Sequence, residues 1–102
     1  MFYIYILYSE SAGIYYIGHT DDPERRLFEH NNSPKKTFTS KFRPWNLVSK
    51  HPISEKRSDA IKIERYLKNR KSKELLNRLI ENQSNGYYIN LLFKKILLKR
   101  KK

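Results

Sequence analysis

The pattern of apolar and polar residues predicts strands in the first half of the chain. Residues 2–8 are β-branched and aromatic without polar alternation, which is typical of a strand covered on both faces. Residues 9–13 form a turn, and residues 14–17 are most simply the hairpin partner of the first strand. A short third strand is expected over residues 45–51, closed by Pro52. The three segments predict a small, mainly antiparallel sheet.

Start signals and helical spacing of apolar residues predict helices in the remainder. The expected helices cover residues 23–30, residues 54 or 58 to about 71, and residues 72 to 84. Polar caps mark their starts: Asp22 before Pro23, then Ser54 or Ser58, then Ser72. Asn85-Gly86 ends the third helix, residues 87–92 are expected to be extended, and residues 93–98 form a last helical turn or two. The order β-β-α-β-α-α predicts an α+β fold with helices packed on the sheet.

Length and composition narrow the class of protein. A chain of 102 residues favours one domain with a modest core. The absence of cysteine excludes disulfides and thiolate-bound zinc. No apolar run approaches the length of a membrane span, and the N-terminus lacks the basic lead of a signal peptide. We therefore expect a cytoplasmic protein with no membrane partner, and no obligate protein partner is evident.

Charge points to a polyanionic partner. Lys and Arg total 22 against 10 acidic residues, a net charge of +12. Six of these cations lie in the last nine positions, and without them the body still carries 16 basic and 10 acidic residues. A field of this sign concentrates phosphate backbones. On charge alone, a general RNA-binding or ribosomal-type protein is favoured over any enzyme.

Glu64 is the most informative single residue. Ala60, Ile63 and Leu67 form the inward stripe of the second predicted helix, and helical geometry places Glu64 at the border of that stripe. An ionised carboxylate there is costly unless it is paired or binds a metal. A single carboxylate suits Mg²⁺, which is often held by one or two carboxylates plus waters and phosphate. A salt bridge to a nearby cation explains the position equally well.

Other polar candidates are less specific. Arg26 and His30 flank the inward Leu27 on the first helix, where a snorkelling arginine and a surface histidine are the simpler interpretation. A tyrosine hydroxyl can orient or deprotonate water if positive charge is near. Residues 33–44 form a surface loop rich in cations and hydroxyl groups. The chain contains no glycine-rich phosphate loop, no G-x-S-x-G and no H-E-x-x-H.

An ordered set of short motifs resembles the GIY-YIG nuclease domain, most closely its small stand-alone bacterial members. The matching segments are Tyr3-Ile4-Tyr5, Tyr16-Ile17-Gly18-His19-Thr20, Pro23 to Leu27, His30-Asn31, Trp45 to Val48 and Ala60 to Glu64. The resemblance covers residues 2 to 72. The contiguous string Gly13 to Gly18 spells the family name, but the two triplets normally sit on separate strands. We align them with residues 3–5 and 16–18, so that Tyr15 points away from the face of Tyr16.

The resemblance implies a metal-dependent endonuclease with residues 1–82 as the nuclease domain and residues 83–102 as a C-terminal extension with a basic tail. The implied catalytic residues are Tyr5, Tyr16, Arg26, His30 and Glu64. One tyrosine would position or deprotonate the attacking water, Arg26 would stabilise phosphate charge, and His30 would contact phosphate or assist proton transfer. Glu64 would be the sole protein ligand of Mg²⁺ or Mn²⁺.

Substrate contacts are expected outside this set. The candidates are His19, Lys35, Lys36, Lys41 and Arg43. Tyr3 departs from the glycine of the first triplet. Many relatives also have a late asparagine in the site, for which Asn85 and Asn90 are unaligned candidates. Two functions stay open: an endonuclease hydrolysing nucleic acid, with DNA the expected partner, and a non-catalytic basic binding module on the same scaffold.

Overall fold

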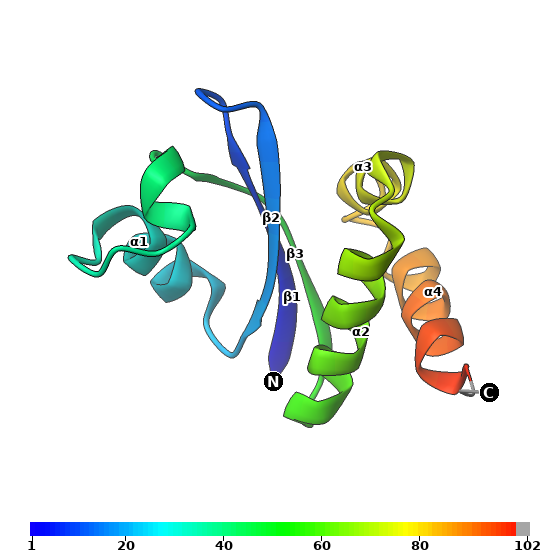
Figure 1. Cartoon of the computed structure of the whole chain (residues 1–102). Helices are drawn as coiled ribbons and strands as arrows, with labels where there is room; N and C mark the ends of the chain where they lie inside the picture. Colours follow the sequence, from blue (N-terminus) through cyan, green and yellow to red (C-terminus); the bar gives the residue numbers. More distant parts are fainter. Residues whose placement is uncertain (100–102) are drawn as a thin grey trace.

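A three-stranded antiparallel sheet separates two helical layers (Figure 1). We describe a computed structural model that covers residues 1–99; the last three residues of the predicted basic tail lie outside the described part. The strands are β1 (Phe2–Ser9), β2 (Ile14–Thr20) and β3 (Asn46–Ser54), in the spatial order β2-β1-β3. Because β1 is central and covered on both faces, it has no solvent-facing polar alternation. The predicted α+β fold is confirmed.

The third strand differs from its predicted end. It continues through Pro52, which lies opposite Tyr3, and ends at Ser54. Proline is tolerated here because β3 is an edge strand, so the missing N–H does not interrupt a second ladder. The register shifts by one residue at two places, which leaves Val48 and Ile53 as extra residues of β3.

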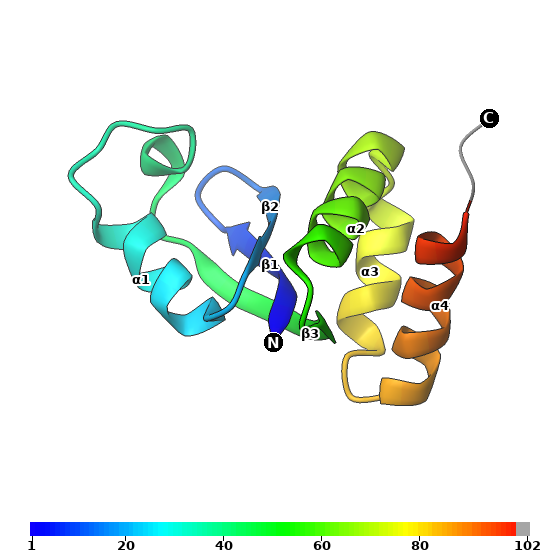
Figure 2. The ribbon, with the colours of Figure 1, turned by 90° about the horizontal axis from the view of Figure 1, so that it is seen from below.

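Helices cover the two faces of the sheet unequally. One face carries α1 (Pro23–Asn32) and the short 3-10 helix η1 (Thr39–Phe42). The other face carries α2 (Arg57–Arg70), α3 (Lys73–Glu81) and α4 (Gly86–Leu98), as Figure 2 shows from below. None of these helices has the length and apolar composition of a membrane-spanning segment within residues 1–99.

The predicted caps are confirmed for two helices and wrong for one. The Asp22 carboxylate accepts from the backbone N–H of Arg25 at α1, and the Ser72 hydroxyl accepts from that of Leu75 at α3. At α2 the cap position is Lys56, without a side-chain hydrogen bond. Ser54 instead accepts from the Lys56 N–H and donates to Asp59 Oδ2, at 3.0 and 2.8 Å. It therefore braces the turn that precedes the helix.

Residues 86–98 form one continuous helix, α4, so the expected extended segment over residues 87–92 is wrong. The Asn85 side chain accepts from the Tyr88 N–H and starts α4 instead of ending α3. Ile89, Phe93 and Ile96 recur at helical spacing and are buried. This burial overrides the strand preference of the aromatic and β-branched residues. The proposed division at residue 82 stays a prediction, and α4 packs into the same core as the sheet.

Successive side chains of β1 point to opposite faces of the sheet and enter two different cores. Ile4 and Ile6 point toward α2–α4 and join the larger core, while Tyr5 and Leu7 point toward α1. The α1 core also contains Trp45, which is buried. Its backbone N–H donates to Asn31 Oδ1 at 2.7 Å, and its carbonyl accepts from Asn31 Nδ2 at 3.0 Å. This pair of hydrogen bonds pins the end of α1 to the start of β3.

Candidate active site

A buried chain of hydrogen bonds lies between the sheet and α1. Tyr5, on the central strand, shares a hydrogen bond of 2.8 Å between its hydroxyl group and Nε2 of His30, in the last turn of α1. The other ring nitrogen of His30, Nδ1, lies 2.9 Å from the hydroxyl of Thr39 in η1. The imidazole is therefore held at both nitrogens, which fixes its orientation.

Burial sets the protonation of these groups. Desolvation raises the pKa of Tyr5 to about 12, although the charge of Arg26 opposes the rise. Desolvation, together with the positive charge of Arg26, lowers the pKa of His30 to about 4. At neutral pH the phenol is protonated and the imidazole neutral. Tyr5 is therefore a poor base in this state, and its hydroxyl proton can be donated to the neutral Nε2 of His30.

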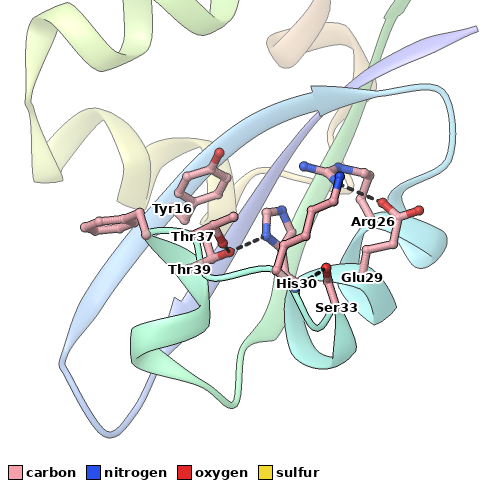
Figure 3. A pocket seen from close by; sticks show the side chains of 9 residues that line it. Tyr16, Arg26, Glu29, His30, Ser33, Thr37 and Thr39 are labelled. Carbon is pink, nitrogen blue, oxygen red and sulfur yellow. Dashed lines mark hydrogen bonds and ion pairs between the residues drawn. The ribbon is translucent and has the colours of Figure 1, made fainter.

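A cavity of about 500 Å³ opens beside the hydrogen-bonded side chains of His30 and Thr39 (Figure 3). It is lined by Tyr16, Arg26, Glu29, His30, Ser33, Lys35, Thr37, Phe38 and Thr39. Nη1 of Arg26 lies 2.7 Å from Oε1 of Glu29, so the guanidinium is already paired. The Tyr16 ring meets the His30 ring edge-on, with 5.1 Å between centroids. Four of the five predicted catalytic residues therefore lie together on the α1 face.

The fifth, Glu64, comes from the opposite layer. It lies on α2 next to the edge strand β2, and its side chain is 19% exposed, so the predicted position at the border of the apolar stripe is confirmed. Oε1 lies 2.5 Å from Nδ1 of His19, and Oε2 lies 2.8 Å from Nζ of Lys68. Burial alone would raise the pKa of Glu64, but hydrogen bonds with Lys68 and His19 outweigh burial and lower it. The carboxylate is ionised at neutral pH.

Lys68 lies between Glu64 and the side chains of the α1 face, at the edge of the sheet. While its ammonium contacts Glu64, it also lies over the Tyr16 ring, 5.2 Å from the centroid. The site therefore lies on both sides of β2. Tyr16, His30 and Arg26 are on the side of α1, and the Glu64 carboxylate is on the side of α2.

The surroundings of Glu64 fit a hydrated divalent cation. A cavity of about 200 Å³ adjoins the carboxylate and is lined by His19, Ile61, Glu64, Arg65, Lys68 and Asn69. At about 30 Å³ per water, it has room for several waters, which Mg²⁺ characteristically retains. The ammonium of Lys68 already marks a position favourable to positive charge. No three His, Asp or Glu side chains within residues 1–99 form a metal-binding cluster.

The predicted substrate-binding residues have different positions. Lys35 lines the larger cavity, and Lys36 and Lys41 are exposed on the neighbouring surface of the loop. Arg43 donates from Nε to the His30 carbonyl at 2.5 Å and from Nη2 to the Ser33 carbonyl at 2.7 Å. These bonds give Arg43 a structural role at the end of α1. His19 contacts Glu64, and its Nε2 lies 3.4 Å from Nη1 of Arg57.

Three further residues of the site were missed by reasoning from the sequence. Thr39 fixes His30, Glu29 pairs with Arg26, and Lys68 pairs with Glu64. The last two have a local signal, because residues three or four apart share a helix face. Thr39 has no such signal, because residues 33–44 show no regular spacing of apolar residues. Of the late asparagines, Asn85 caps α4 and Asn90 is exposed.

Known proteins resemble most of this chain. The profile of the GIY-YIG catalytic domain matches residues 1–78. A UPF0213 protein of Enterococcus faecalis is 40% identical over 76 residues, which is 71% of this chain and 84% of that relative. A UPF0213 protein of Streptococcus pneumoniae is 35% identical over 84 residues, which is 82% of this chain and 83% of that relative. No solved structure matches the chain.

Proposed function

This chain belongs to the GIY-YIG catalytic domain family, and from that premise we propose that it is a metal-dependent endonuclease that hydrolyses phosphodiester bonds of nucleic acid, with DNA as the expected substrate. One observation carries the proposal. An ionised, partly exposed carboxylate, Glu64, lies across a single edge strand from a cluster of tyrosine, histidine and arginine side chains. A protein that only binds nucleic acid does not need a carboxylate at this position, because a negative charge there repels the phosphate backbone.

The residues on the α1 face would bind the phosphate and the attacking water. Arg26 would stabilise the negative charge that develops on the phosphate, after exchanging its contact with Glu29 for one with substrate. Tyr5 and His30 are held by one hydrogen-bonded chain with Thr39, so they would form a rigid wall beside the attacking water. Tyr16 is less buried and lies next to the ammonium of Lys68, which favours it over Tyr5 for proton transfer.

Glu64 would hold Mg²⁺ or Mn²⁺, which when bound supplies Lewis acidity toward the phosphoryl oxygen and the leaving group. His19 would keep the carboxylate oriented through its bond to Oε1. Lys68 would give up Oε2 and turn its ammonium toward substrate phosphate. A lysine can do this because its stem is flexible, and the Lys68 side chain is 44% exposed.

The alternative function is a non-catalytic nucleic-acid-binding module, which the net charge of +12 supports. In that case Glu64 would be a structural ion pair with His19 and Lys68. The two functions differ in what removal of the carboxylate charge does to stability and to cleavage.

The test is the variant Glu64→Gln, with Glu74→Gln as its control. Glu74 lies on α3, is exposed and pairs with Arg78 at the surface. Purified proteins would be incubated with Mg²⁺ or Mn²⁺ and labelled single-stranded, duplex, flap and branched DNA, and with the matching RNA strands. We expect cleavage by the wild type and by Glu74→Gln, and a loss of about 100-fold or more in Glu64→Gln, because each ~1.36 kcal/mol of lost stabilisation is tenfold in rate.

Melting temperature and metal-free binding, measured on the same samples, separate the two functions. Both partners of Glu64 are partly exposed and can be hydrated, so we expect the melting temperature of Glu64→Gln to stay near that of the wild type. Metal-free binding should persist. A variant that is unstable yet cuts at the wild-type rate per folded molecule would reject the nuclease function of this residue.

A further inference from the structure

We propose that the 500 Å³ cavity on the α1 face binds one unpaired nucleobase, stacked on Phe38, so that the preferred substrate carries an unpaired nucleotide beside the bond that is cut. This inference rests on the proposed nuclease function for the cut and on the cavity itself for the base. The ligand is therefore a nucleotide out of the helical stack, as in a single strand, a flap or a bulge.

The cavity has the size and lining of a site for a small polar ring. Its volume lies within the range of about 300–1,000 Å³ that is typical of small-molecule sites. The walls combine one exposed aromatic ring, Phe38, with the hydroxyl groups of Ser33 and Thr37. Hydroxyl groups can donate or accept, so they suit the edge of any base and imply little sequence preference.

Phe38 is placed as a stacking surface. It is 55% exposed, although its neighbour Phe42 is half-buried and supports it with 5.1 Å between ring centroids. Its ring is inclined by 28° to that of Tyr16, with 6.4 Å between centroids. An aromatic base could cover the exposed part of the Phe38 ring.

The charges of the cavity orient the nucleotide with its base inward. Arg26 and Lys35 can contact backbone phosphates, whereas Glu29 is a carboxylate in the same wall. Glu29 lies 2.7 Å from Arg26 and 3.6 Å from Arg25, so it offsets part of the positive charge of this wall. A neutral base tolerates that carboxylate, and exocyclic amino groups can donate to it.

A paired base cannot occupy this position. In a duplex both faces of each base are covered by its neighbours, so a base that stacks on Phe38 must first leave the helix. Unstacking costs least where the nucleotide is already unpaired. The cavity therefore selects substrates by the presence of an unpaired nucleotide.

The test measures metal-free binding by fluorescence anisotropy with three oligonucleotides: a duplex with one bulged nucleotide, the same duplex with an abasic residue in the bulge, and the fully paired duplex. We expect the wild type to bind the bulged nucleotide about 5- to 150-fold more tightly than the abasic bulge, which is the fold-change of base–aromatic stacking. The variant Phe38→Ala should lose this difference, and Phe38→Tyr should retain it.

Phe28→Ala is the matched control. Phe28 is 66% exposed on α1 and does not line the cavity, so this variant should discriminate like the wild type. Equal binding of all three oligonucleotides by the wild type would overturn the inference, and so would discrimination that survives in Phe38→Ala. Because binding is measured without metal, these outcomes are independent of whether the protein cuts. Cleavage that is unaffected by the bulge would reject the predicted substrate preference while leaving the nuclease function intact.

Discussion

Gly18 lies directly opposite Tyr5 in the ladder between β1 and β2, and the Tyr5 ring covers it. A Cβ atom added to Gly18 would lie 2.4 Å from the Tyr5 hydroxyl oxygen and 2.5 Å from Cζ. The glycine is therefore needed for close approach of an aromatic ring rather than for an unusual backbone conformation. It allows the phenol to reach His30, 2.8 Å away.

Gly18→Ala should displace the Tyr5 ring and break its hydrogen bond to His30. The Tyr5 ring is buried and cannot move without disturbing the core, so we expect a loss of about 1–3 kcal/mol of unfolding free energy in urea. Cleavage per folded molecule should fall as well. Gly86→Ala is the control, because nothing lies within 4 Å of a Cβ there and stability should be unchanged or higher. Equal effects of the two substitutions would contradict this account.

Lys68→Met should strengthen the binding of Mn²⁺ at Glu64 several-fold, even though it removes a cation from the substrate face. The ammonium and a metal ion compete for the same carboxylate, and methionine keeps the apolar stem without the charge. Mn²⁺ affinity can be followed by electron paramagnetic resonance on the protein alone. Lys62→Met, on an exposed position of α2, should leave that affinity unchanged. An unchanged affinity in Lys68→Met would place the ion elsewhere.

Protein stability should fall as the pH is lowered from about 6.5 toward 4, in part because of His51. This side chain is buried between the sheet and α4, where desolvation lowers its pKa to about 4. A histidine with an ordinary pKa of about 6.5 in the unfolded chain then binds its proton only on unfolding. The stabilisation is complete above pH 6.5 and is lost as the pH falls toward 4.

The variant His51→Gln tests this linkage. Removing one such group should flatten the dependence of unfolding free energy on pH by up to about 1.4 kcal/mol per pH unit inside that window. His30→Gln should flatten it similarly, because the pKa of His30 is also lowered to about 4. An unaltered slope in both variants would show that acid instability has another origin.

The loop beside the cavity should contribute to substrate affinity more than to the chemical step. Replacing Lys35, Lys36 and Lys41 by Gln should raise KM more than it lowers kcat and should reduce the salt dependence of binding. The control loses the same charge from exposed residues of the opposite layer: Lys62, Lys94 and Lys95. If the two triple variants behave alike, total charge and not position determines affinity.

Much of the fold followed from periodicity, whereas its C-terminal part did not. The burial of β1 on both faces could be predicted because its apolar residues do not alternate with polar ones. Only the second half of α4 could be predicted, because Tyr87 to Ile89 favour strands by propensity and Asn85-Gly86 is also typical of a helix end. Burial of Ile89, Phe93 and Ile96 decides between the two, and burial depends on tertiary contacts.

In the site, too, positions within one helix could be predicted, whereas contacts between residues far apart in the sequence could not. The border position of Glu64 follows from the geometry of one helix, so the sequence located it correctly. Its contact with His19 joins residues 45 positions apart and depends on how α2 lies against β2. Arg43 was expected at the substrate, and its bonds to the carbonyl groups of His30 and Ser33 depend on how the loop folds against the end of α1.

Trp45 gives the site a natural optical reporter. It is the chain's one tryptophan, it is buried, and its indole N–H donates to the Thr39 carbonyl at 2.8 Å. Its ring lies 6.1 Å from that of Tyr16, and Thr39 and Tyr16 both line the cavity. One chromophore therefore senses the packing of the α1 core and the wall of the cavity together. Intrinsic emission can follow unfolding and ligand entry on the same unlabelled sample, with red-shifted light on unfolding and altered intensity on ligand binding.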